Sequence, residues 1–463
     1  MNFPAQEHKQ SDRGIPLSER RWEIGPLVYS FSGLVVLFGW LLFGDFAWNA
    51  RERAITPLVQ LMLEGEGVSD TIVGLLVGSL PAALGMFIAP VVGYRSDRFR
   101  SRLGRRIPFL LVSTPVASAA MLGLAFAPAV GGWLHKMLGG NSPGLALCFL
   151  AFFTVCWIGF EVAAVVGNTL FLALINDVVP RVMLGRFFGL FRVVSIVVGI
   201  LFNFFLMGKA EEYLCEVLIG LAVIYCAGFT LMCLRVKEGE YPLVSETENR
   251  EGFSVSVRRY FRECFTHRYY LWLFGALALA NMAFTPVNIF SIFYAKSVDM
   301  GMGAYGKILA GGFVVSLLTS YPIGSLADRF HPLRIALAAL LVYFPLCIWA
   351  VIWARTSGTF AFGFAIHVII SGIFFTGTAS LGQRLFPKER FAQFASAGQM
   401  ILGLLTMLLP PMTGLILDMS GHAYQLTFLV GAILCLLAVA SFLVVMKYFH
   451  RLGGDAAYHP PNT

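Results

Sequence analysis

The sequence predicts an all-α polytopic membrane protein, with twelve transmembrane helices in two pseudo-symmetric bundles of six. Three observations carry this prediction. First, 57% of the 463 residues are hydrophobic and only 13% are charged, with a mean hydropathy of +0.75. No soluble domain of this size buries so much apolar surface. Second, Lys and Arg gather at alternate ends of the apolar spans, and third, a sequence motif recurs in both halves of the chain.

The basic residues predict the orientation. Of 34 Lys and Arg residues, 27 fall in the tails and loops on one side of the apolar spans. By the positive-inside rule this side is cytoplasmic, so both termini are expected in the cytoplasm, and the net charge of +8 does not indicate nucleic acid. The first 26 residues are polar and basic, so we expect no secretory processing. With its repeated apolar spans, the chain is expected to be a multi-pass protein of the cell inner membrane.

The spans themselves follow from length, because one crossing needs about 20 apolar residues. The first is long enough to tilt strongly, bend near Pro57 or project beyond the membrane. A polar segment at 235–265 divides the chain into an amino-terminal bundle (1–234), a cytoplasmic central loop (235–265) and a carboxyl-terminal bundle (266–463). The expected spans are 27–63, 70–94, 107–130, 144–176, 187–208, 212–234, 268–297, 304–327, 332–354, 359–382, 392–417 and 424–447.

An internal repeat supports the division into two halves. The loop GYRSDRF at 93–99, after the second span, matches GSLADRF at 324–330, after the eighth. The first span also has a counterpart in the seventh, where uncharged residues at 281, 285 and 288 keep the spacing of the polar residues at 45, 49 and 52. Parallel repeats of this kind place a binding site near the midplane, between the halves.

The polar stretch of the first span supplies the candidates for ion coupling. At about 100° per residue, Asp45, Asn49 and Glu52 share one helix face. A carboxylate facing lipid costs roughly 2.5 to 3.5 kcal/mol, so these groups are expected to face protein or a water-filled cavity. We predict that Asp45 and Glu52 form a cation-coupling pair, with their neighbours Arg51 and Arg53 holding them ionised. The alternative is an interfacial extension whose charges meet water outside the membrane.

Uncharged polar side chains supply the candidates for substrate binding. Donors and acceptors of this kind suit a ligand rich in hydroxyl groups. The alternatives are interhelical hydrogen bonding for the amides, a structural role for the histidine and packing for the tryptophan. The candidates are Trp48, Asn49, Asn168, Asn281, Thr285, Asn288, His367 and Gln399.

The chain resembles a known family. Twelve spans, a central loop and the duplicated G-x-x-[SA]-D-R loop resemble the major facilitator superfamily over nearly the whole chain. The run SDRFRSRLGRRIP at 96–108 is similar to the SDR-x-x-SR-x-GRR-x-P loop of the glycoside-pentoside-hexuronide and sucrose cation symporters. This resemblance implies rocker-switch alternating access and a sugar-like substrate. It also implies that Glu161, in the fourth span, belongs to the cation-coupling set, and the alternative is a structural hydrogen bond to a neighbouring helix. Melibiose-type members bind sodium through acidic residues of the second helix, but 71–92 has none here, which favours protons over sodium.

The resemblance also implies gating by the repeated loop. Each loop aspartate, Asp97 or Asp328, is expected to lie against the amino-terminal end of a helix in the opposite half, where the helix dipole favours an anion. This contact forms only when the cytoplasmic side is closed. The arginines have an alternative role in retaining the loops inside the cell and contacting lipid phosphate. The gating set is Gly93, Asp97, Arg98, Arg105, Arg106, Gly324, Asp328 and Arg329.

Together these patterns predict a monomeric secondary transporter that takes up a sugar or glycoside with protons. It is not expected to be an enzyme or to hold a cofactor or metal, because no Walker loop, zinc spacing or nucleophile elbow occurs in a suitable context. The eight cysteines show no paired spacing. One alternative is an exporter of small organic molecules, and another is a non-transporting factor for pigment delivery or assembly.

Overall fold

The computed structural model describes residues 21–24, 26–180, 182–239, 253–387 and 390–461. Most of the chain predicted as an amino-terminal tail (residues 1–20) and the middle of the predicted central loop (240–252) lie outside these residues. Within them, twelve helices are long and apolar enough to cross a membrane. The predicted all-α fold with twelve spans is thereby confirmed.

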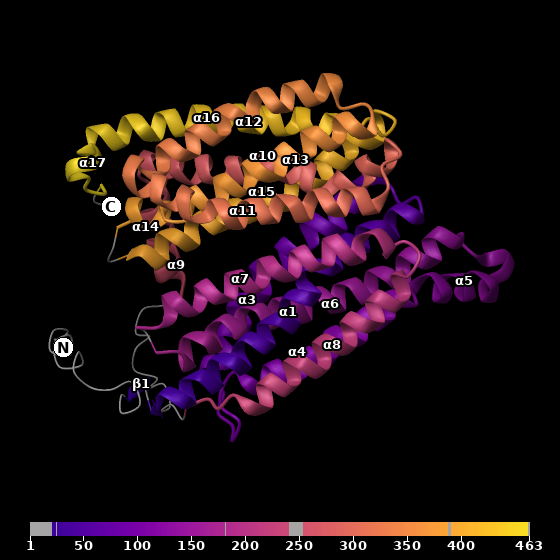
Figure 1. Ribbon diagram of the computed structural model, residues 1–463, viewed down its shortest axis with the longest axis horizontal. Coiled ribbons are helices and arrows are strands. Elements are labelled where there is room, and N and C mark those ends of the chain that lie inside the picture. The colour runs from indigo at the N-terminus through magenta and orange to yellow at the C-terminus, as the bar shows by residue number, and fades with distance from the viewer. Residues whose placement is uncertain (1–20, 25, 181, 240–252, 388–389, 462–463) are drawn as a thin grey trace.

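The first bundle contains six of these spans (Figure 1). Its second and fifth spans each include a π-helical stretch within a longer helix. The elements are α1 (Phe31–Gly65), α2 (Asp70–Val73) continuing through η2 (Gly74–Ser79) into α3 (Leu80–Arg98), α4 (Ile107–Ala125), α6 (Leu145–Val178), α7 (Leu184–Leu201) extended by η4 (Phe202–Leu206) and η5 (Met207–Lys209), and α8 (Leu214–Arg235).

The second bundle contains the other six spans (Figure 1). Helix α10 runs through its centre, between α15 and α16, and is the most buried span of the molecule. The elements are α10 (Arg268–Ser297), α11 (Met302–Phe330), α12 (Pro332–Trp353), α13 (Ser357–Thr378) followed by α14 (Leu381–Leu385), α15 (Phe391–Met419) and α16 (Leu426–Arg451).

Several shorter elements, which include η3 (Gly139–Asn141) and α17 (Gly454–Ala457), were not predicted. Two of them are an antiparallel hairpin, β1 (Trp22–Ile24) and β2 (Leu27–Tyr29), which precedes α1. The third predicted span ends early at Ala125, and α5 (Ala127–Leu138) starts anew with a proline in its first turn, where the missing N–H costs nothing. Helix α9 (Phe253–Phe265) forms inside the predicted central loop and packs on α10 and α15.

Helix α1 has 35 residues, which at about 1.5 Å per residue gives about 50 Å. This length exceeds a hydrocarbon core of about 30 Å, which agrees with the expectation that the first span tilts strongly, bends near Pro57 or projects beyond the membrane. Inside the first bundle α1 packs on α7 and α8, and it also reaches α10 of the second bundle.

The two bundles join at one end of the molecule. We call the end that carries the described termini the terminal end and the end with loops 66–69, 210–213, 298–301 and 420–425 the far end. In Figure 1 the bundles converge at the far end. There the backbones touch, because a Cβ on Gly74 would overlap the carbonyl of Pro410, and one on Gly414 would overlap that of Asp70.

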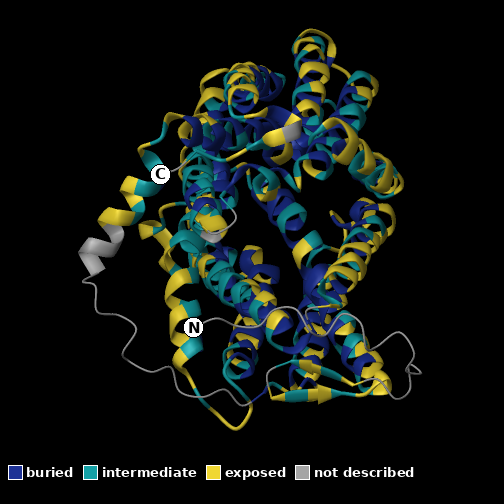
Figure 2. Ribbon diagram, turned by 90° about the vertical axis from the view of Figure 1, so that its left-hand side faces the viewer, coloured by how far each residue is buried: buried dark blue, intermediate teal, exposed yellow. Residues whose placement is uncertain are grey.

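Among the described residues, the hydrogen bonds between the two bundles are also found toward the far end. They begin at mid-depth, where the Arg192 guanidinium donates to Thr376 Oγ1 at 3.1 Å, and continue to the far end. Seen from the terminal end, buried residues concentrate inside each bundle (Figure 2). The molecule is therefore closed at the far end, and its bundles separate toward the terminal end.

Candidate functional site

The polar stripe of α1 begins inside the first bundle. Asp45 and Asn49 are both buried, one helical turn apart. The Asn49 amide donates to Asp45 Oδ1 at 2.5 Å and to the Asp45 carbonyl at 2.9 Å. Asp45 Oδ2 has no hydrogen-bond partner among the described residues. The two residues share one helix face, as their spacing predicts, and in this conformation this part of the stripe lies within the bundle.

The centre of the stripe is an ion pair between sequence neighbours. Arg51 Nη2 donates to Glu52 Oε2 at 2.7 Å, with the Arg51 side chain fully buried and that of Glu52 55% exposed. The guanidinium lies 4.0 Å from the Trp48 ring centre and 4.9 Å from that of Tyr225. A cation held over aromatic faces gains up to about 2 kcal/mol when desolvated. The pair therefore joins a buried cation to an anion that reaches the surface.

The Arg51 guanidinium is only partly satisfied. Its Nε and Nη1 atoms have no hydrogen-bond partner within the described part of the chain. A buried polar group without a partner is costly, and a charged one more so, which makes such groups rare outside functional sites. Arg51 is thus able to take a further acceptor.

Two more charged residues, Glu161 and Arg53, lie near the ion pair of Arg51 and Glu52. Glu161 on α6 is half-buried and interacts electrostatically with both Arg51 and Glu52. Arg53 donates to Ser195 Oγ on α7 from Nη2 at 2.7 Å and from Nε at 3.2 Å. Its guanidinium also lies 5.6 Å from the ring centre of Phe313, which belongs to α11 of the second bundle. The structure therefore brings Arg51, Glu52 and Glu161 together.

In the second bundle, His367 holds one of the predicted amides in place. His367 is fully buried and uses both ring nitrogens, Nε2 at 3.0 Å from Asn288 Oδ1 and Nδ1 at 2.9 Å from the Tyr343 hydroxyl. With the amide oxygen as acceptor, the hydrogen is assigned to Nε2, and the Tyr343 hydroxyl donates to Nδ1. His367 thus fixes Asn288, which lies on the exposed side of α10.

The remaining substrate candidates take separate positions. Asn281 Nδ2 donates to the Leu277 carbonyl at 2.8 Å, and Thr285 Oγ1 donates to the Asn281 carbonyl at 3.2 Å. Both bonds lie within α10, so the interhelical alternative holds for Asn288 but not for these two. The exposed residues are Asn168 and Gln399, whereas Trp48 is buried against Phe171 and Phe229.

Direct contact joins the two halves of the candidate site. Gln60 Nε2 donates at 3.0 Å to the carbonyl of Ile289, the residue that follows Asn288. Gln60, Arg192 and Ser195 were missed as site residues. Gln60 and Arg192 could have been found from the sequence, because Gln60 ends the polar stretch of the first span and Arg192 is a charge eight residues into α7. Nothing in the sequence pattern indicates Ser195.

The first gating loop is held within its own bundle. Arg106 Nη2 contacts Asp97 Oδ1 at 2.5 Å, and Arg105 Nη2 donates to Asp177 Oδ1 at 2.7 Å. The buried Glu238 accepts the backbone N–H groups of Arg106 at 2.8 Å and of Ile107 at 3.3 Å, at the start of α4. Burial raises the pKa of Glu238, and these backbone donors act in the opposite direction. Asp177 and Glu238 were not predicted.

The second gating loop behaves similarly. Asp328 pairs with Arg384 of α14, in the same bundle. Arg98 lies 3.6 Å from the ring centre of Tyr94, and Arg329 stacks on the neighbouring phenylalanine at 5.2 Å. A Cβ on Gly93 or Gly324 would meet nothing within 4 Å. The expected contacts with the opposite half are absent from the described residues in this conformation, and they stay a prediction for the conformation closed at the terminal end.

Comparison with known proteins assigns the chain to a family. A family model described as MFS/sugar transport protein matches residues 61–387. Proton-associated sugar transporter A of Homo sapiens is 34% identical over 110 residues, which cover 24% of this chain and 12% of that protein. The Mus musculus protein of the same name matches to the same extent. The chain thus spans about an eighth of the length of these relatives.

Solved structures share the fold. A bacterial homologue of the human lysosomal transporter Spinster has a TM-score of 0.66 at 15% identity, with 92% of this chain and 99% of that chain covered. A D-xylose-proton symporter has a TM-score of 0.60 at 15% identity, with 90% and 96% covered. At these identities the likeness concerns the fold.

Proposed function

Since the chain belongs to the MFS/sugar transport protein family and is a membrane transporter, not an enzyme, we propose that it imports a sugar or glycoside together with protons. In this proposal the terminal end, rich in Lys and Arg, faces the cytoplasm of a cell whose inner membrane the helices cross. The closed far end then faces outward, and the conformation described here is open to the inside.

The observation that supports proton coupling is the incompletely bonded guanidinium of Arg51. Among the described residues, the guanidinium has one carboxylate partner, Glu52, and two donor atoms without a partner, while Glu161 interacts with it electrostatically. When a proton binds the Glu52 carboxylate, that oxygen loses its charge and its hold on Arg51. The free donors of Arg51 then attract Glu161. Protonation of Glu52 therefore moves the ion pair of Arg51 from a carboxylate of its own helix, α1, to a carboxylate of α6. In this way proton binding is coupled to the relative position of the two helices.

The substrate class follows from the uncharged side of the site. Asn288 presents an amide whose oxygen is bound by His367 and whose Nδ2 has no partner among the described residues. Such a donor on a fixed side chain suits a hydroxyl oxygen of a sugar. The curated relative is named a proton-associated sugar transporter, and one structural neighbour is a D-xylose-proton symporter, which supports the same class.

A transport assay in proteoliposomes tests the coupling. Glu52→Gln and Glu161→Gln are expected to abolish uptake driven by a pH gradient but to keep solute counterflow, which requires no net proton movement. Glu216→Gln, in the first turn of α8, is the matched control and is expected to keep both activities. Full gradient-driven uptake by both site variants would remove the proposed coupling.

The same preparation distinguishes the alternative functions. A thermal-shift screen of sugars and glycosides identifies the ligand, because a compound that binds only the folded state raises the melting temperature. Substrate movement only out of the cell along proton gradients would indicate an exporter. Copurified pigment without counterflow of any solute would indicate an assembly factor.

A further inference from the structure

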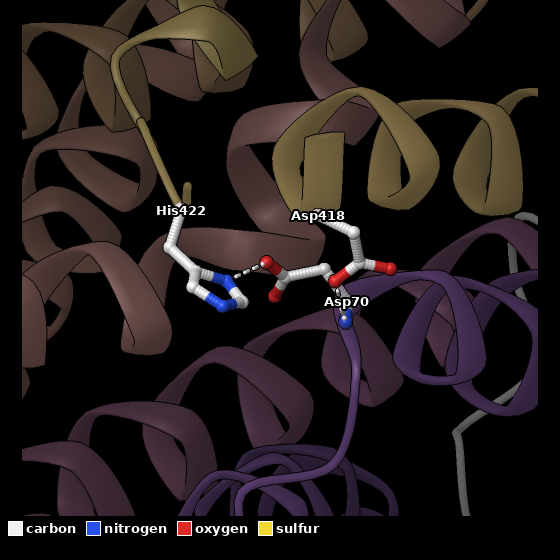
Figure 3. Close-up of side chains that lie close together, drawn as sticks. All are labelled: Asp70, Asp418 and His422. Carbon is white, nitrogen blue, oxygen red and sulfur yellow. Dashed lines mark hydrogen bonds and ion pairs between the residues drawn. The ribbon is translucent and has the colours of Figure 1, made fainter. Parts of the chain in front are cut away.

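The polar cluster at the far end is already complete. Figure 3 shows the His422 ring directed at Asp70, with Asp418 beside it. Asp418 accepts the backbone N–H groups of Asp70 at 2.8 Å and of Thr71 at 2.9 Å. Asp70 accepts hydrogen bonds from His422 Nδ1 at 2.7 Å and from the Tyr424 hydroxyl at 3.2 Å. Each carboxylate oxygen of the two aspartates has a protein donor, so this contact joins the bundles without a further ligand.

The terminal end of the first bundle carries a groove of about 490 Å³. It lies between β2, the first turns of α1 and residues 235–237 after α8, and we call it the rim groove. The hairpin is packed closely over the chain that leaves α8, since a Cβ on Gly239 would lie 2.7 Å from the Pro26 ring. In Figure 2 the two strands lie at the edge of the first bundle that is turned away from the second. The rim groove is therefore peripheral, at the level where α1 begins and α8 ends.

Two cations line the rim groove. Helix α8 ends at Arg235, and the chain continues in an extended conformation through Val236, with φ −78° and ψ 126°. Successive side chains of an extended chain point to opposite sides, so Val236 is buried while Arg235 and Lys237 are both exposed. The Arg235 guanidinium lies 5.5 Å from the ring centre of Trp40. Neither cation has a carboxylate partner among the described residues.

The start of α1 adds hydrogen-bond donors to the same groove. Ser30 caps the helix by accepting the Gly33 N–H at 3.1 Å, and the hydroxyls of Ser30 and Ser32 lie 3.1 Å apart. The backbone N–H groups of Phe31 and Ser32 have no acceptor within the helix. The first turn contains no acidic residue, so the positive end of the helix dipole is not compensated there. Cations and helix donors thus favour one anionic group in the rim groove.

The floor of the rim groove is apolar. It is formed by Val36, Leu37 and Trp40 of α1. Val36 and Trp40 are one helical turn apart, and Phe43 follows with its ring centre 6.1 Å from that of Trp40. Val36 is 58% and Phe43 42% exposed, so an apolar strip leads from the groove along α1 into the membrane. A ligand that fits both parts carries an anionic head and a hydrocarbon tail.

We propose that the rim groove binds an anionic phospholipid of the leaflet at the terminal end. Its phosphate lies between Arg235, Lys237 and the first turn of α1, and an acyl chain lies along Val36 and Trp40. Anionic headgroups are attracted to basic residues at the membrane surface, and a small soluble anion would leave the apolar floor uncovered. The site goes beyond the proposed function, because it requires only that the helices cross a membrane. With the proposed orientation the leaflet is the cytoplasmic one.

Native mass spectrometry of the full-length protein in detergent tests the lipid site. The protein is titrated with phosphatidylglycerol or with phosphatidylcholine of the same acyl chains, and the Kd of the first bound lipid is determined. The unmodified protein is expected to bind phosphatidylglycerol about 30-fold more tightly, because a basic residue near an anionic lipid contributes a factor of about five and the rim groove has two. Millimolar inorganic phosphate is expected not to displace the lipid.

Charge variants assign this preference to the rim groove. The double variant Arg235→Gln and Lys237→Gln is expected to bind both lipids with similar Kd values. The matched control is Lys447→Gln with Arg451→Gln, which removes two exposed cations at the end of α16, the last span of the second bundle. This control is expected to keep the preference for phosphatidylglycerol.

A second pair of variants tests occupation of the groove without any change of charge. Val36→Trp fills the floor of the rim groove and is expected to weaken the binding of both lipids. Val35→Trp is its control, because Val35 is 56% exposed and does not line the groove. All substituted side chains are exposed, so the melting temperature is expected to stay unchanged.

Four results would overturn the proposal. They are equal Kd values for the two lipids in the unmodified protein, a loss of preference in the α16 control as large as in the rim-groove variant, unchanged lipid binding by Val36→Trp, and displacement of the lipid by inorganic phosphate, which would indicate a site for a soluble anion. The measurement involves neither a solute nor a proton gradient. Its failure would therefore leave the proposed function untouched, and a failure of proton-coupled uptake would leave the lipid site untouched.

Discussion

Replacing Glu238 by alanine is expected to destabilise the start of α4. Its side chain is fully buried and accepts the backbone N–H groups of Arg106 and Ile107 at 2.8 and 3.3 Å. These donors belong to the first turn of α4 and have no partner within the helix. Removal of the carboxyl leaves them without a protein acceptor.

The magnitude follows from these contacts. Loss of a helix cap costs about 1 kcal/mol, and a buried donor left without an acceptor costs about 1 to 3 kcal/mol. Against this stands the cost of burying a carboxylate, which raises the pKa of Glu238. We expect Glu238→Ala to lower stability by about 2 kcal/mol at pH 4.5, where the carboxyl is half protonated even in the unfolded chain, and by less at pH 7.

The sign of the pH dependence can be stated. Because the pKa of Glu238 is raised on folding from an ordinary value of 4.5, the folded protein binds this proton more tightly than the unfolded chain. The contribution of Glu238 to stability is therefore greatest below pH 4.5 and falls as the pH rises through its folded pKa. Glu238→Gln keeps an acceptor for the backbone donors and carries no proton, so its stability relative to the unmodified protein is expected to increase over the same range.

Thermal unfolding in detergent from pH 4.5 to pH 8, with hydrogen exchange of the Arg106 and Ile107 amides, measures both effects. Glu238→Ala is expected to lower the melting temperature and to expose these two amides. Glu23→Gln, on the exposed hairpin strand β1, is the control and should leave both measurements unchanged. A Glu238→Ala protein with the original melting temperature and protected amides would show that Glu238 does not cap α4.

Three further substitutions test the site and the closed far end. His367→Phe releases Asn288 and is expected to weaken sugar binding by about 1 to 2 kcal/mol, or roughly tenfold in Kd, with the fold intact; unchanged Kd by isothermal titration would exclude this positioning role. Gly74→Leu is expected to open the far end because the facing backbone leaves no room, whereas Gly85→Leu, with nothing within 4 Å of its Cβ, should not; equal accessibility of far-end labels in both would contradict this. Arg192→Ala removes the cross-bundle hydrogen bond nearest the terminal end among the described residues and is expected to increase labelling of that end; unaltered labelling would show that the bond does not hold the bundles together.

The transmembrane spans were predictable because apolar length alone determines them. The seventh span was predicted at 268–297, and α10 covers the same residues. The sequence signal fails where helices are short or polar. Helix α9 owes its stability to packing on the second bundle, and α5 begins after a break of one residue that apolar composition does not reveal.

Within the candidate site, the sequence predicted which residues of one helix share a face, but it missed most contacts between helices. The Asp45 and Asn49 pair follows from a spacing of four residues. In contrast, the partner of Asn288 lies 79 positions away on α13, and Asp418 lies 347 positions from Thr71. No local pattern encodes such pairs, because they depend on how the two bundles are placed.

In the proposed mechanism, the two halves of the repeat have different roles. On α1 the stripe carries Asp45, Glu52 and two arginines, whereas on α10 the equivalent positions are uncharged and bonded to their own helix or to His367. A buried charge changes its partners when it gains or loses a proton, but a neutral amide fixed by a buried histidine keeps its geometry. The first bundle is therefore suited to sense the proton and the second to recognise the solute. Coupling then requires contacts that cross between them, and Gln60 with the Ile289 carbonyl and Arg53 with Phe313 provide such contacts.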